Sequence, residues 1–122
     1  MIDTVTDASF EADVIAPTTP VLVELGASWC PPCRAMAPVL TQLAREREGS
    51  LRVVTVDSDA NPQIVDRFGV MSVPTLLLFS GGEQLHRGVG YTAKPKLLRV
   101  VDETLGERAR LTGGTGRGSL HG

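Results

Sequence analysis

The sequence predicts one α/β domain, in which strands and helices alternate along the chain. Near-continuous apolar runs such as residues 21–25 are typical of strands covered on both faces, as in a parallel sheet. Between these runs, apolar side chains recur at helical spacing. The 122 residues, 42% of them hydrophobic, are enough to bury a core without disulfide cross-links.

The first helix is separated from the first strand by prolines. Thr6 offers an N-cap side chain to a helix predicted over residues 8–14. Pro17 lies beyond it, and a proline does not continue a helix. The apolar run 21–25 is the first predicted strand, with one carboxylate, Glu24, inside it.

The longest helix is predicted from the first cysteine to about Gly49. Its apolar positions recur at helical spacing and are Met36, Val39, Leu40, Leu43 and Ala44. Residues 51–56 form the next apolar strand. Asn61 is then predicted to cap a short helix that begins with a proline and that Gly69 ends.

A hairpin and a helix complete the predicted domain. Residues 76–79 and 84–89 read as strands joined through Gly81 and Gly82, a pair typical of tight hairpin turns. The last helix is predicted over residues 94–105, where leucine and valine share one face.

The composition changes near Gly106. We assign residues 1–106 to one domain and residues 107–122 to a flexible C-terminal tail containing glycine and arginine. The tail carries a small positive charge, which permits a weak electrostatic contact, although a solvated extension without function is the simpler interpretation.

The charge balance and the apolar pattern argue against several functions and locations. A formal net charge of −2 argues against nucleic-acid binding through phosphate contacts. The apolar runs are too short to span a membrane. The first eleven residues lack the basic and apolar regions of a signal peptide, so a reducing cytoplasm is the expected compartment.

The segment Cys30-Pro31-Pro32-Cys33 is the main chemical motif. Because a disulfide between residues three apart restricts the unfolded chain little, a structural role is not expected. Positions i and i+3 of a helix lie on one face, close enough for a disulfide to open and close. The helix N-terminus stabilises a thiolate at Cys30, so Cys30 is the predicted nucleophile and Cys33, expected to be better covered, resolves the mixed disulfide.

Two other interpretations of the cysteines are less favoured. A structural zinc site needs four ligands, and beyond the thiols the chain offers only His86 and His121, so no metal is expected. Inert buried thiols are disfavoured by the position at a helix start beside the only tryptophan.

The sequence resembles the thioredoxin family from the first helix to about residue 105. The matching features are Trp29-Cys30-x-x-Cys33, Pro38, Val73-Pro74-Thr75, Gly82 and Gly90. The resemblance implies the thioredoxin fold, a central mixed five-stranded sheet flanked by about four helices. It also implies a reversible Cys30–Cys33 disulfide at the carboxyl end of a strand.

The resemblance further implies which residues bind substrate. Pro74 would follow a cis peptide bond, and the backbone of Val73 would pair with an extended substrate segment. Trp29 would cover one side of the disulfide, and Gly90 would lie near the docking site. Pro31 and Pro32, between the cysteines, belong to the same predicted surface. An ordinary trans proline and a purely structural tryptophan are the alternatives.

Glu24 stands where thioredoxins place a buried aspartate that relays protons to the second cysteine. Burial should raise its pKa toward neutrality, although a side chain that reaches solvent is the alternative. Three positions depart from the family. Pro31 replaces a glycine, Gly26 replaces a second tryptophan and leaves looser packing or room for another side chain, and Thr55 replaces a lysine near the carboxylate.

The predicted function is therefore thioredoxin-like reduction of protein disulfides, with Glu24 moving protons. The resemblance implies an NADPH-dependent thioredoxin reductase as electron donor, disulfide-containing client proteins, no cofactor bound by the chain itself, and a monomer. Two alternatives stay open: a thioredoxin-fold binding or assembly module with dispensable thiols, and an exported disulfide oxidase or isomerase.

Overall fold

A computed structural model describes the backbone of residues 2–118 and the side chains of residues 2–111. Its centre is a five-stranded mixed sheet in the order β1-β3-β2-β4-β5. The strands are β1 (Asp3–Thr4), β2 (Val21–Gly26), β3 (Arg52–Asp57), β4 (Thr75–Ser80) and β5 (Glu83–Val89). β1, β3 and β2 run parallel, whereas β4 and β5 are antiparallel to their neighbours.

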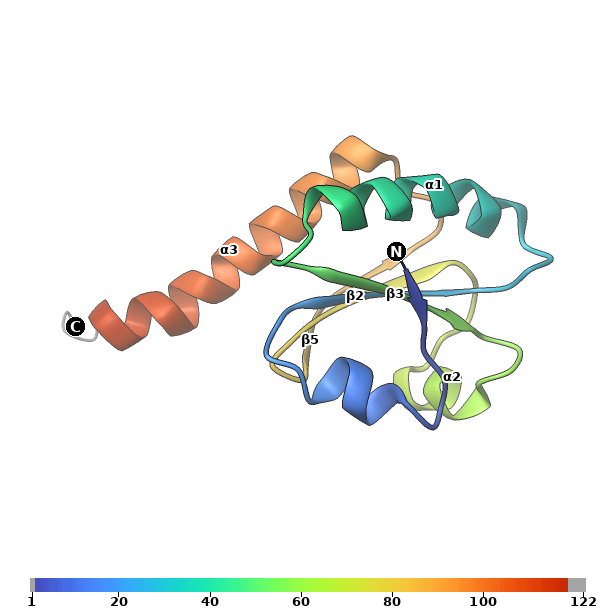
Figure 1. Ribbon diagram of the computed structural model, residues 1–122, viewed down its shortest axis with the longest axis horizontal. Helices are drawn as coiled ribbons and strands as arrows, with labels where there is room; N and C mark the ends of the chain where they lie inside the picture. Colours follow the sequence, from blue (N-terminus) through green and yellow to red (C-terminus); the bar gives the residue numbers. More distant parts are fainter. Residues whose placement is uncertain (1, 119–122) are drawn as a thin grey trace.

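Helices cover both faces of the sheet. α1 (Pro31–Glu46) and α3 (Lys94–Gly118) lie on one face, and η1 (Glu11–Ile15) and α2 (Pro62–Phe68) lie on the other (Figure 1). Each face has its own apolar core. The predicted α/β class, with a mixed five-stranded sheet and about four helices, is confirmed.

The central strand β2 positions the functional residues. Every residue of β2 is buried, because β3 and β4 flank it and helices cover both of its faces. Leu22 belongs to the core beneath α1 and α3. Since side chains alternate along a strand, Glu24 and Gly26 face the same side as Leu22, toward α1. The strand therefore directs a carboxyl group toward the helix that carries the cysteines.

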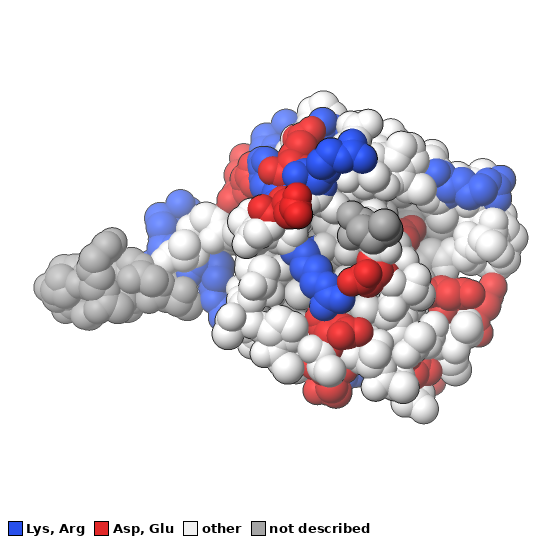
Figure 2. All heavy atoms as spheres, in the orientation of Figure 1, with Lys and Arg blue, Asp and Glu red and all other residues white. Residues whose placement is uncertain are grey.

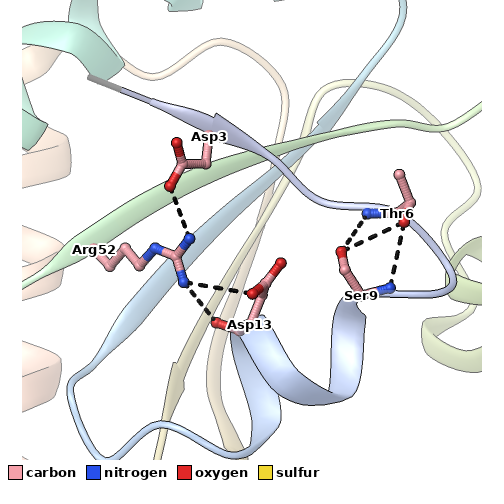
Figure 3. A network of polar contacts seen from close by, with 5 residues as sticks. All are labelled: Asp3, Thr6, Ser9, Asp13 and Arg52. Atoms are coloured by element: carbon pink, nitrogen blue, oxygen red, sulfur yellow. Dashed lines mark hydrogen bonds and ion pairs between the residues drawn. The ribbon is translucent and has the colours of Figure 1, made fainter.

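The N-terminal segment differs from the prediction. The first helix is η1, which spans Glu11–Ile15 rather than residues 8–14. Thr6 and Ser9 form a turn before it, in which each backbone N–H donates to the other residue's hydroxyl oxygen (Figure 3). This turn occupies the positions where the helix was expected to begin. The two-residue strand β1 was not predicted.

Arg52 of β3 joins these N-terminal elements. Figure 3 shows its guanidinium between Asp3 of β1 and Asp13 of η1. Nη2 lies 2.8 Å from a carboxylate oxygen of Asp3, and Nη1 donates to the Asp13 carbonyl at 3.3 Å. The side chain thus holds the edge of the sheet against the helix that follows it.

The cap of α2 also comes from a different residue than predicted. Asn61 makes no side-chain capping hydrogen bond. Instead, the carboxylate of Asp7 accepts the N–H groups of Gln63 and Ile64, at 3.2 and 2.9 Å. The Asn61 amide accepts the N–H of Asp7 at 2.8 Å. Asn61 therefore positions the residue that caps the helix.

The last helix is longer than predicted. α3 continues past residue 105 to Gly118. Gly106 takes no left-handed conformation that would end the helix, and residues 107–111 favour helix. Glu107 and Arg110 form an ion pair one turn apart, and Arg108 lies 2.8 Å from Glu83 of β5. The end of α3 extends beyond the sheet (Figure 1). Residues 119–122 of the predicted tail lie outside the described residues.

Acidic and basic side chains are interspersed over the face that Figure 2 shows, where the described residues form no continuous basic stripe. Within the described part of the chain, no helix is long and apolar enough to cross a membrane.

Candidate active site

The two cysteines lie where β2 ends and α1 begins. Cys30 is the N-cap residue of α1, and Cys33 lies in its first turn. They form a disulfide with a Cα–Cα distance of 5.2 Å. Pro31 and Pro32 occupy the first two helical positions, where a missing N–H costs no intrahelical hydrogen bond. The N-cap and the prolines thus start the helix directly after Cys30.

One hydrogen bond distinguishes the two sulfur atoms. The backbone N–H of Cys33 donates to Sγ of Cys30 at 3.2 Å. Sγ of Cys30 also lies 3.7 Å from the carbonyl oxygen of Val73. A donor directed at Cys30, together with the positive end of the helix dipole, favours negative charge on this sulfur.

The relative exposure of the cysteines differs from the prediction. Cys30 is 2% exposed and Cys33 is 8% exposed, so Cys33 is not the better covered residue. The cysteines form a small buried cluster with Ala27, and Val73 packs against this cluster. Cys33 also faces a surface hollow beside β2, which accounts for its slightly greater exposure.

Trp29 flanks the disulfide and is anchored by a residue that the sequence reasoning missed. Its side chain is 63% exposed. The indole Nε1 donates to Oδ2 of Asp59 at 2.7 Å. Asp59 lies in the loop between β3 and α2, and its backbone N–H donates to a carboxylate oxygen of Asp57 at 3.0 Å. The acidic composition of this loop was visible in the sequence, but its proximity to Trp29 was not.

The loop before β4 lies at the same end of the sheet as the cysteines, because Thr75 at the start of β4 pairs with Leu25 near the end of β2. The peptide bond between Val73 and Pro74 is cis. The N–H of Gly90 donates to the Pro74 carbonyl at 2.8 Å. Gly90 has a φ of +93°, a conformation that favours glycine. Fold and hydrogen bonding thus bring Val73, Pro74 and Gly90 together beside Cys30.

Exposed apolar side chains gather on the segments that carry these residues. Besides Trp29, the exposed large apolar residues include Met71, Val89 and Tyr91. Met71 precedes Val73 by two residues, and Val89 and Tyr91 flank Gly90. An open groove is lined by Trp29, Met71 and Val73 among others. Concentrated exposed apolar surface is typical of a protein-binding site.

Glu24 is the buried acid of the site. Its side chain is 6% exposed, and its strand neighbours in the sheet are Thr55 and Leu76. Burial raises the pKa of Glu24 from 4.5 to about 7, because desolvation disfavours the charged form. Glu24 and Cys33 line the same hollow of about 470 Å³. A carboxyl group that titrates near neutral pH therefore faces the hollow that Cys33 also borders.

The site contains no arrangement of metal ligands. In the described part of the chain, no three residues among histidine, cysteine, aspartate and glutamate are grouped so that they could hold a metal ion. His86 lies on β5, and His121 lies outside the described residues.

Comparison with known proteins gives one family. The family model described as Thioredoxin matches residues 1–103. Thioredoxin 1 of Nostoc sp. is 41% identical over 101 residues, which are 83% of this chain and 94% of that protein. Thioredoxin of Mycobacterium bovis is 46% identical over 101 residues, 83% of this chain and 87% of that protein. The bifunctional thioredoxin reductase/thioredoxin of Mycobacterium leprae is also 46% identical over 83% of this chain, but the match spans 22% of that protein.

Proposed function

Since this chain belongs to the thioredoxin family and is a thiol–disulfide oxidoreductase that reduces protein disulfides, we propose how its residues divide the reaction. The thiolate of Cys30 attacks one sulfur of a client disulfide, which forms a mixed disulfide and releases the first client thiolate. Cys33 loses its proton and attacks Sγ of Cys30. The Cys30–Cys33 bond forms, the second client thiolate leaves, and the client has gained two electrons.

The assignment of Cys30 as nucleophile depends on the hydrogen bond from the Cys33 N–H to its sulfur. This donor, at the N-terminus of α1, is directed at the sulfur of Cys30 and not at that of Cys33, so it stabilises a thiolate at Cys30. Exposure alone would favour Cys33, but both cysteines are buried and their exposed fractions differ by only a few per cent. The electrostatic environment therefore supports Cys30 as the nucleophile.

Trapping of the mixed disulfide tests this order. With a disulfide-bonded test protein, Cys33→Ser should accumulate a covalent complex, because nothing resolves it. Cys30→Ser should accumulate none. A complex that forms instead with Cys30→Ser, at comparable rate, would assign the attack to Cys33.

Glu24 acts as the proton acceptor for Cys33. A general base is most effective when its pKa lies near the working pH, and a value of about 7 meets this condition. The shared hollow supports a transfer between the two groups, directly or through water. Thr55, its neighbour on β3, offers no positive charge that would keep the carboxyl ionised.

Clients dock on the apolar surface around the disulfide. The backbone of Val73 pairs with an extended client segment, while Trp29, Pro74 and Gly90 shape the docking surface. Pro31 and Pro32, in the first turn of α1, belong to the same surface. The exposure of Trp29 and the hydrogen bond between Gly90 and Pro74 support this role.

The electron donor proposed for this chain is an NADPH-dependent thioredoxin reductase. The Mycobacterium leprae relative is named as a reductase joined to a thioredoxin, which supports such a partnership. We further propose that the protein transports electrons in the cytoplasm and acts as a monomer. Residues 1–106 form the proposed catalytic domain. All proposed site residues, up to Gly90, fall within this range.

A further inference from the structure

The carboxylate of Glu24 fills the space that a side chain at position 26 would take, on the same face of β2. A Cβ atom added at Gly26 would lie 2.6 Å from Oε2 of Glu24 and 3.2 Å from its Cδ and Oε1. A contact of 2.6 Å is far shorter than van der Waals contact, so the carboxylate lies where a side chain at position 26 would be. Gly26 is not among the glycines with positive φ. The structure therefore needs glycine there for space and not for backbone conformation.

The space at Gly26 is part of the hollow that Cys33 borders. Besides Glu24, Gly26 and Cys33, its wall includes two charged residues, Arg34 of α1 and Asp57 at the end of β3. Its remaining lining residues carry no charge. Leu76, which faces Glu24 from β4, is apolar. The titratable neighbours of the carboxyl group in this hollow are thus Cys33, Arg34 and Asp57.

We propose that Gly26 is a positioning residue for proton transfer: its missing side chain lets the Glu24 carboxylate lie over position 26, in the hollow that it shares with Cys33. The inference rests on the proposed role of Glu24. In the resolving step, the carboxylate accepts the proton of the Cys33 thiol, and the thiolate attacks Sγ of Cys30. The protonated carboxyl then releases its proton to water in the hollow.

An added methyl group should displace the carboxylate and leave the fold intact. The atoms that it would meet belong to the end of a flexible side chain and not to backbone. Glu24 can therefore turn away from position 26 without movement of β2. Proton transfer is sensitive to displacements of about 1 Å, so the resolving step should be affected more than folding.

The test is a set of variants at the two positions, with the resolving step measured from a preformed mixed disulfide between pH 5 and 9. Gly26→Ala should slow resolution about tenfold near pH 7 and shift the midpoint of its pH profile. Glu24→Asp shortens the side chain by one methylene, which withdraws the carboxylate from position 26. In the Glu24→Asp background, the added alanine should therefore slow resolution less than threefold.

Gly88→Ala is the matched control. Gly88 also lies in a strand, but its added Cβ would meet only Nε2 of His86, at 3.6 Å, which is ordinary contact. This variant should resolve the mixed disulfide at the rate of the unmodified chain. Gly26→Ala with unchanged rate and pH profile overturns the proposal. So does an equal loss in the Glu24→Asp background, because the effect would then not pass through the carboxylate.

Two further measurements separate the positioning role of Gly26 from the relay role of Glu24 and from an effect on folding. If Glu24→Gln leaves the rate of resolution unchanged, the relay role of Glu24 itself fails. If Glu24→Gln slows resolution but Gly26→Ala does not, only the positioning role of Gly26 is overturned. If Gly26→Ala unfolds the chain, its effect on stability is compared with that in a Glu24→Ala background. The proposal expects the destabilisation to disappear there, and an equal destabilisation in both backgrounds contradicts it.

Discussion

The indole Nε1 of Trp29 donates a hydrogen bond to Oδ2 of Asp59, with a distance of 2.7 Å between the two atoms. Thirty positions separate the two residues in sequence, and both are exposed. The bond connects the loop before α1 with the loop before α2. It restrains the large exposed ring of Trp29, the residue before Cys30, so that this part of the proposed docking surface is preformed.

Asp59→Ala should weaken client binding. Loss of a hydrogen bond worth about 1 kcal/mol corresponds to an increase of about fivefold in KM for a disulfide-bonded client, with a smaller change in kcat. Steady-state reduction of the client measures both constants. Asp66→Ala removes the same charge from an exposed position of α2 and should change neither. An unchanged KM for Asp59→Ala would show that the ring needs no anchor.

The buried carboxyl of Glu24 should make stability depend on pH. Its pKa is 4.5 in the unfolded chain and about 7 in the folded chain. As pH rises between these values, the unfolded state loses a proton that the folded state retains, so the free energy of unfolding falls. Relative to Glu24→Gln, the unmodified chain should lose about 3 kcal/mol between pH 4.5 and pH 8, and little more above that.

Urea unfolding across this pH range measures the difference. Glu48→Gln removes the same charge from an exposed position of the chain and controls for net charge. Parallel stability curves for Glu24→Gln and the unmodified chain would mean that the Glu24 carboxyl is solvated in the folded state.

Asp7 should stabilise α2 although it lies more than fifty residues before it. Its carboxylate accepts two N–H groups of the first turn, those of Gln63 and Ile64. Replacing a capping side chain by alanine costs about 1 kcal/mol, and we expect this loss for Asp7→Ala in urea unfolding. Asp7→Asn keeps an acceptor and should lose less. Equal stability of Asp7→Ala and the unmodified chain would exclude the cap.

The extent to which the sequence predicts the structure depends on the range of the interactions. α2 begins at a proline and ends before Gly69, whose φ is +61°, because both signals act within the local backbone. The cap of the same helix was wrongly predicted, because Asn61 is a good local candidate and Asp7 reaches the helix only through the tertiary fold. The two-residue strand β1 forms by pairing with β3 and has no periodicity of its own.

The same distinction applies to the site. The spacing of Cys30 and Cys33 predicts a disulfide at a helix start because both partners lie within one turn. Asp59 was missed because its role depends on how two loops meet. The space taken by the Glu24 carboxylate over Gly26 was also not predictable in detail, since it depends on the orientation of the carboxyl group.

Truncation after Gly106 should leave catalysis intact, because the proposed site residues all precede it. The shortened chain loses the ion pair between Arg108 and Glu83. Ion pairs at the protein surface contribute about 0–1 kcal/mol to the free energy of unfolding. Client reduction should keep its kcat and KM. A folded truncated chain with a raised KM would assign part of the client-binding surface to the end of α3.

The redox potential should lie near that of cytosolic reductants and should respond to one backbone N–H. An N-cap side chain accepts from the second or third helical residue, and here the second is Pro32, which has no N–H. The Cys30 thiolate therefore has the Cys33 N–H as its donor, which stabilises the reduced form only modestly. We expect a potential of about −270 mV, far from the −120 mV or so of strong oxidants.

Pro32→Ala restores the missing donor and should raise the potential by about 20 mV, the equivalent of about 1 kcal/mol of added stability in the reduced form. Pro31→Ala adds an N–H at the first helical position, which does not reach an N-cap side chain, and should change the potential less. Fluorescence of Trp29 in defined thiol buffers measures both variants. A lower potential for Pro32→Ala, or equal shifts for both, would contradict the control of the Cys30 thiolate by the first turn of α1.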